Sequence, residues 1–227
     1  MYFDWTYLLF VVPALLISVW AQFKVSSAFS NYSKVLTSRG LTGAQASEYI
    51  LRANGVSGVR IEHISGELTD HYDPTANVIR LSDAVYGSTS VAAVGVAAHE
   101  TGHAIQYAVG YQPIKLRAAV IPVSRIGSVA SWPLLMLGIL FGLMPLVWLG
   151  IGFFCLATLF QVLTLPVEFN ASSRALQAID QRNILSPEEY TGAKKVLTAA
   201  ALTYVAALLT SIMQLLRLLV IFSNRRS

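Results

Sequence analysis

The residues best suited to chemistry form the run His99-Glu100-Thr101-Gly102-His103, which is an H-E-x-x-H pattern. On a helix of 3.6 residues per turn, positions i and i+4 lie on one face, so both imidazoles can reach a single metal ion with Glu100 beside them. Neutral imidazole is a good ligand for Zn²⁺, and a catalytic zinc site takes three protein ligands and leaves a fourth position for water. The spacing predicts one zinc ion per chain, with Glu100 as the general base that takes a proton from that water.

The alternative is a chance match inside a buried helix. The surrounding stretch, Val91 to Tyr107, is otherwise built mainly of Ala, Val and Gly. Such an apolar helix has no other use for two histidines and a glutamate at neighbouring positions, because buried polar groups are costly unless they are satisfied. The flanks therefore favour a metal site.

A third protein ligand must come from another part of the chain. The acidic residues after the motif are Glu168, Asp180, Glu188 and Glu189. Glu168 heads an apparent helix, residues 166–179, at the end of a long apolar run, where an unpaired carboxylate would be costly. The competing interpretation is a solvated carboxylate that the helix dipole favours. We expect Glu168 to be the third ligand.

Four further polar residues are candidates for supporting roles. Ser172 lies four residues after Glu168 on the same helical face, where its hydroxyl could bond to a ligating histidine. His71 and Tyr72 could donate to the oxyanion of a tetrahedral intermediate, although we favour a loop that packs Tyr72 and leaves His71 solvated. Arg174 could stabilise the oxyanion or pair with a substrate carboxylate, or it could be an ordinary interfacial arginine.

The composition indicates the environment in which this chemistry takes place. Of the 227 residues, 55% are hydrophobic and only 12% are charged, which is too apolar for an ordinary soluble protein. The net charge of +4 is modest and no Lys/Arg-rich run occurs, so nucleic acid is excluded as an expected partner. The single cysteine, Cys155, cannot form an intramolecular disulfide. The sequence predicts an integral membrane protein.

Long apolar runs predict four membrane helices. The first spans about residues 5–21 and lacks the positive n-region of a cleaved signal peptide, so we interpret it as a retained anchor. The segment Ile126–Val167 has 42 residues without a charged side chain, about twice one bilayer span, and must fold back as helices over about 128–141 and 146–165. The last runs over about 196–222. This hairpin would return Glu168 to the side of the membrane that holds the motif.

The polar region after Lys24 predicts a small α+β portion. A helix is expected over residues 43–53, and two strands over 59–63 and 77–82, with the turn-rich segment 65–74 between them. The second strand could pair with an extended peptide. Hydroxyls at 88–90 would cap the motif helix.

These elements suggest five segments and an orientation. The segments are an anchor (1–23), a catalytic portion (24–125), a membrane hairpin (126–167), a third-ligand helix and loop (168–195), and a last membrane helix with its tail (196–227). The positive-inside rule places the catalytic portion in the cytoplasm, although the Arg225–Arg226 pair opposes this if the last helix crosses fully.

The residues also carry a family resemblance. HETGH, a membrane hairpin and then Pro-Val-Glu-Phe-Asn-Ala-Ser, with the segment Asp70–Pro74 and the first anchor, resemble the YugP-type zinc-dependent membrane metallopeptidases. A more distant similarity is to the HtpX and CAAX-processing membrane proteases, whose second motif is E-x-x-A-D. Here Ser172 replaces that last Asp. The resemblance implies a zincin-like core, with Glu168 as a zinc ligand, in a predominantly α-helical membrane protein.

The resulting prediction is a membrane-embedded zinc endopeptidase that acts on membrane proteins or on peptides near the lipid bilayer. The alternative from another class is a membrane scaffold that binds partners and retains a zinc site, but such a site has no need of Glu100. A transporter would require paired ionisable residues near the middle of the bilayer, and the spans contain almost none.

Overall fold

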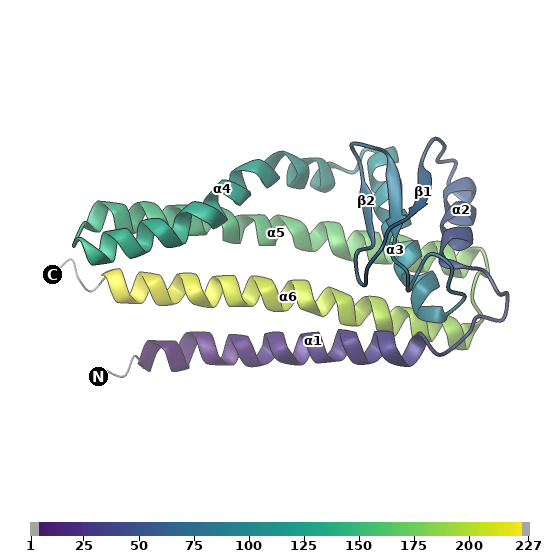
Figure 1. Ribbon diagram of the computed structural model, residues 1–227, viewed down its shortest axis with the longest axis horizontal. Coiled ribbons are helices and arrows are strands. Elements are labelled where there is room, and N and C mark those ends of the chain that lie inside the picture. The colour runs from purple at the N-terminus through teal and green to yellow at the C-terminus, as the bar shows by residue number, and fades with distance from the viewer. Residues whose placement is uncertain (1–4, 224–227) are drawn as a thin grey trace. The chain divides into compact units, whose positions relative to one another are not determined.

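The computed structural model describes residues 5–223, so the Arg225–Arg226 pair lies outside the described part. The described chain is predominantly helical, with one small sheet (Figure 1). In chain order the elements are a π-helical turn (Tyr7–Val11), α1 (Val12–Tyr32), α2 (Gly43–Ala53), β1 (Arg60–His63), β2 (His71–Asp73), β3 (Val78–Leu81), α3 (Val91–Ala108), α4 (Gln112–Leu140), α5 (Met144–Gln181) and α6 (Pro187–Ser223).

Within residues 5–223, four helical segments are long and apolar enough to cross a membrane, namely Tyr7–Tyr32, Gln112–Leu140, Met144–Gln181 and Pro187–Ser223. At a rise of about 1.5 Å per residue, each exceeds the roughly 30 Å of a hydrocarbon core. The expected helical membrane protein with a small α+β portion is confirmed.

The helix boundaries differ from the sequence-based expectation in three places. The first hairpin helix begins at Gln112, not near residue 128, and α6 begins at Pro187, not near 196. The expected break before Glu168 is absent, because α5 continues through Pro166 to Gln181. A proline removes one helical hydrogen bond, and a long membrane helix tolerates this loss. Glu168 therefore lies inside a helix and not at its head.

Prolines also accompany the bend of α4. That helix contains Pro122 and Pro133, and Figure 1 shows it bent along its length.

Gly142 in the tight turn to α5 has φ +67°, a left-handed conformation that favours glycine.

The sheet has one more strand than expected. The segment predicted as a turn-rich connection contains β2, which pairs antiparallel with β3, while β1 pairs parallel with β3 on its other side. Asp70 fixes the start of β2, since its carboxylate accepts bonds from the Ser82 backbone N–H (2.7 Å) and hydroxyl (2.9 Å). Because β3 is paired on both sides, the expectation that it could pair with an added peptide strand is wrong.

The chain divides into two compact units, each with its own packing. One combines residues up to 22, 115–166 and from 203 onward; in it α1 and α6 are joined by a 2.9 Å hydrogen bond between Ser18 and Thr210. The other combines residues 23–114 and 167–202. Its core packs α2, α3 and the sheet with parts of α5 and α6, around buried residues such as Ile50, Val94 and Ile179.

Candidate metal centre

Helix α3 carries the motif and is well defined at its start. The Ser90 side chain accepts a hydrogen bond from the Ala93 backbone N–H (3.2 Å), so the predicted hydroxyl cap is confirmed. The helix then presents His99 and His103 one turn apart, with ring centroids separated by 4.8 Å.

Small residues let α5 approach α3 closely at this point. A Cβ on Gly102 would lie 2.5 Å from the Ala171 carbonyl oxygen, which is far below normal contact. Only glycine fits here without moving one helix. The close approach brings Glu168, three residues before Ala171, against the two histidines.

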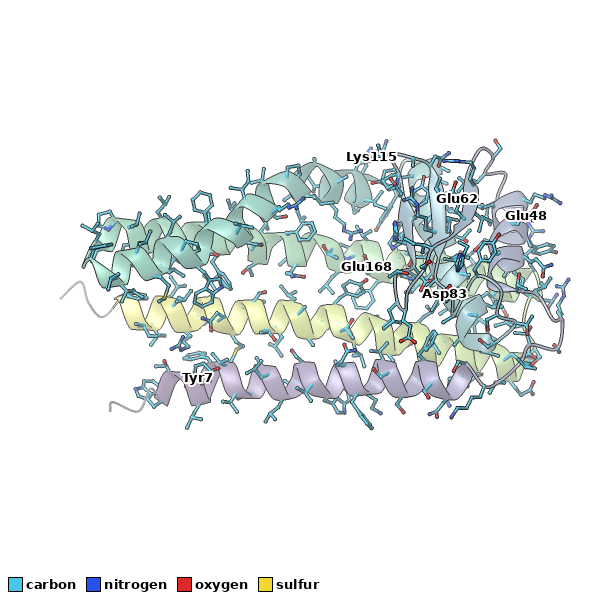
Figure 2. All side chains as sticks on the ribbon, viewed as in Figure 1. Tyr7, Glu48, Glu62, Asp83, Lys115 and Glu168 are labelled. Atoms are coloured by element: carbon cyan, nitrogen blue, oxygen red, sulfur yellow. The ribbon has the colours of Figure 1, made fainter. Side chains whose placement is uncertain are left out.

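The Glu168 carboxylate faces both imidazoles. Its Oε2 lies 3.3 Å from His99 Nε2 and 3.5 Å from His103 Nε2, and the side chain is only 3% exposed. Figure 2 labels Glu168 on α5. Among residues 5–223, His99, His103 and Glu168 form a group that could hold a metal ion. Their ligand atoms all lie within 4.8 Å of one another.

These distances fit zinc. Ligand atoms about 2.0–2.1 Å from a tetrahedral zinc ion lie about 3.3–3.4 Å from one another, which is close to the two carboxylate–imidazole separations. Burial by itself lowers the pKa of His103, but the hydrogen bond with Glu168 and the charge of Glu100 outweigh it, so that pKa is raised. The geometry and the charge both suit a cation bound among the three side chains.

Glu100 is held beside this group and is not part of it. Its Oε2 accepts a 3.0 Å hydrogen bond from the Tyr72 backbone N–H on β2. Burial raises the pKa of the Glu100 carboxyl, against the opposing influence of His99 and His103. A carboxyl with a raised pKa is better matched to accepting and returning a proton near neutral pH.

Each histidine has a second partner on its other ring nitrogen. The Ser172 hydroxyl lies 3.0 Å from His99 Nδ1, as its position on the face of Glu168 suggested. His103 Nδ1 lies 2.9 Å from Gln106 Oε1, and Gln106 is completely buried. Gln106 was not predicted from the sequence, although a polar residue three positions after His103 in an apolar helix was a signal that could have indicated it.

The other candidate side chains are engaged elsewhere. The Tyr72 hydroxyl donates to Asn77 Oδ1 (2.7 Å). The hydrogen bond from Tyr72 to Glu100 comes from the backbone N–H and not from this hydroxyl. His71 donates from Nδ1 to the Thr69 carbonyl (2.7 Å). Arg174 donates from Nε to Asn170 Oδ1 (2.8 Å) and covers the Tyr111 ring at 5.9 Å.

A cavity of about 480 Å³ lies between α5 and α6. Ser172 lines it together with apolar side chains such as Leu176 and Leu197, and Asp180 and Lys194 add opposite charges. Ser172, whose hydroxyl contacts His99, is therefore also one of the residues that line this cavity.

Comparisons with known proteins point to zinc-dependent peptidases. The family described as "Putative neutral zinc metallopeptidase" matches residues 7–223. The chain is 49% identical over 221 residues to the "Putative membrane protease YugP" of Bacillus subtilis (strain 168), covering 97% of this chain and 98% of that protein. No solved structure matches the chain.

Proposed function

Since this chain belongs to the neutral zinc metallopeptidase family, we propose that it hydrolyses peptide bonds at a zinc site formed by His99, His103 and Glu168, with Glu100 as the general base. The observation that carries the proposal is the buried Glu168 carboxylate, 3.3 and 3.5 Å from the two Nε2 atoms. An HExxH pair completed by a glutamate is the ligand set of a gluzincin-type peptidase.

The protein groups divide the chemistry between them. A zinc ion held by the three side chains would polarise the scissile carbonyl and acidify a water molecule. Glu100 takes the proton from the attacking water and delivers it to the leaving amine, so the carboxyl returns to its starting state. The Tyr72 backbone N–H holds the carboxylate in position for both transfers.

The substrates that suit this site are membrane proteins or peptides close to the bilayer. Glu168 belongs to α5, which is itself one of the four candidate spans. One of the three proposed zinc ligands therefore lies on a helix that enters the membrane. The positive-inside rule supports a cytoplasmic catalytic portion, since Lys24, Lys34, Lys115 and Lys194 lie near the ends of these spans on its side.

The test compares Glu100→Gln with the parent protein, purified in detergent, for zinc content and for cleavage of an unstructured protein. Retained zinc with cleavage reduced by about 10²–10⁴-fold is expected for loss of a general base. The matched control is Glu48→Gln on the exposed surface of α2 (Figure 2), where the carboxylate pairs with Arg52 one turn away; this variant should cleave normally.

The metal ligand is tested separately with Glu168→Ala, which should lower bound zinc sharply. Unchanged zinc stoichiometry in Glu168→Ala would remove Glu168 from the site. Equal cleavage by Glu100→Gln and the parent would refute the proposed mechanism and leave a zinc-holding scaffold as the better interpretation.

A further inference from the structure

We propose that Arg174, Asn170 and Gln106 form a hydrogen-bonded chain whose direction decides which nitrogen of His103 carries its proton, and that this chain positions His103 as a metal ligand. The inference rests on the proposed function, because it takes His103 to be a ligand. It makes Gln106 and Asn170 positioning residues and gives Arg174 a role other than contact with substrate.

The direction of the chain starts at Arg174. A guanidinium Nε–H can only donate, so the Asn170 atom 2.8 Å away must be the carbonyl oxygen, Oδ1. The same oxygen lies 3.0 Å from the Gln106 amide, which must therefore present its nitrogen. The Val167 backbone carbonyl, 2.8 Å from that nitrogen, imposes the same choice, since it too can only accept.

This orientation leaves Gln106 Oε1 facing His103 Nδ1 at 2.9 Å. Because an amide oxygen only accepts, Nδ1 must carry a hydrogen. In the neutral imidazole that binds a metal, the lone pair therefore lies on Nε2, which is 3.5 Å from the Glu168 carboxylate. A ligating imidazole needs that lone pair free. Gln106 is 0% exposed, so water cannot substitute for the bond if the amide is lost or reversed.

The chain also joins the two helices that supply the ligands. Gln106 and His103 lie on α3, whereas Val167 and Asn170 flank Glu168 on α5. The amide nitrogen of Gln106 thus donates to Val167 and Asn170, which lie on either side of Glu168 in the sequence. The amide oxygen of Gln106 orients His103. One buried side chain sets the orientation of His103 and the separation of that ligand from Glu168.

The first experiment measures the zinc dissociation constant of Gln106→Met, purified in detergent, by competition with a chelating indicator, together with the melting temperature of the zinc-free protein. Met keeps the shape of Gln but neither donates nor accepts effectively. Zinc binding should weaken by about 10–100-fold, the usual effect of removing the partner of a ligating histidine. The control is Thr101→Val, which removes a buried hydroxyl that donates to the Ala97 carbonyl on the same helix; its zinc affinity should stay within about threefold of the parent.

The second experiment tests the direction of the chain. Asn170→Asp still accepts from both Arg174 and Gln106, so it should bind zinc within about threefold of the parent, whereas Asn170→Leu accepts from neither and should bind more weakly. Binding by Gln106→Met within threefold of the parent would overturn the proposal, as would equal losses in the two Asn170 variants. If Gln106→Met does not fold, the Asn170 pair decides the question. A parent protein that binds no zinc would instead refute the proposed function.

Discussion

Adding one methyl group at Gly102 should change the distance between the helices that carry the proposed zinc ligands. In Gly102→Ala, the new Cβ would lie 2.5 Å from the Ala171 carbonyl oxygen and 3.1 Å from its carbonyl carbon. Non-bonded heavy atoms prefer separations of about 3.5 Å or more, so α3 and α5 must move apart by about 1 Å. Backbone atoms cannot rotate away as a flexible side chain would.

The displacement affects the metal more than the fold. Metal–ligand distances tolerate about 0.2 Å, so a shift of about 1 Å removes Glu168 from an ideal position. We expect the zinc dissociation constant of Gly102→Ala to rise by at least about 100-fold, equivalent to about 2.8 kcal/mol. Overpacking costs about 1–3 kcal/mol, but replacing a helical glycine by alanine stabilises by about 1 kcal/mol. The zinc-free protein should therefore lose only about 0–2 kcal/mol of unfolding free energy.

The assay combines chelator competition, for zinc affinity, with denaturant unfolding of the zinc-free protein. The matched control is Gly95→Ala, two turns earlier on α3, where the new Cβ would meet Ala193 Cβ at an ordinary 3.5 Å. Gly95→Ala should keep zinc affinity and gain up to about 1 kcal/mol of unfolding free energy. If Gly102→Ala binds zinc as tightly as the parent and keeps its helices, the close approach of α3 and α5 does not set the site.

Three further outcomes are expected. Ser172→Ala should weaken zinc binding by about 10–100-fold in the same competition assay, because His99 Nδ1 loses its partner at 3.0 Å; unaltered affinity would show that this hydroxyl does not support the ligand. Removing zinc with a chelator should lower the unfolding free energy by about 2.7 kcal/mol relative to protein with free zinc at 100 times its dissociation constant, and the difference should vanish in Glu168→Ala. Thr42→Ala should lower the free energy of unfolding by about 1 kcal/mol, measured by thermal or denaturant unfolding, without changing zinc affinity. The reason is that it removes the capping box that Thr42 and Gln45 form at the start of α2. A loss of unfolding free energy below about 0.3 kcal/mol would contradict this expectation.

Features with a local cause were predicted well from the sequence. The i, i+4 spacing of His99 and His103 follows from helical geometry alone, and the apolar runs predicted the four spans because length and composition decide them. Glu168 was proposed because a carboxylate beside a membrane span needs a partner, and the structure brings it within 3.5 Å of both imidazoles.

Features that depend on distant contacts were missed. Strand β2 has three residues and is defined by its pairing with β3, so its turn-rich sequence gave no alternation to detect. The role of Gly102 appears only when Ala171 of another helix is set against it, and that of Gln106 only with Val167 and Asn170 in place. Pro166 was misread as a helix start, because a proline within a long apolar helix has the same local signature.

The distance along the chain between the ligands has a consequence for biosynthesis. Glu168 follows His99 by 69 residues, and the two-helix turn through Gly142 lies between them. At about 5–20 residues per second, the ribosome needs roughly 3 to 14 s to add that stretch. A nascent chain that has already exposed the helix with His99 and His103 still lacks Glu168, so the proposed metal centre cannot assemble until translation has passed the turn at Gly142.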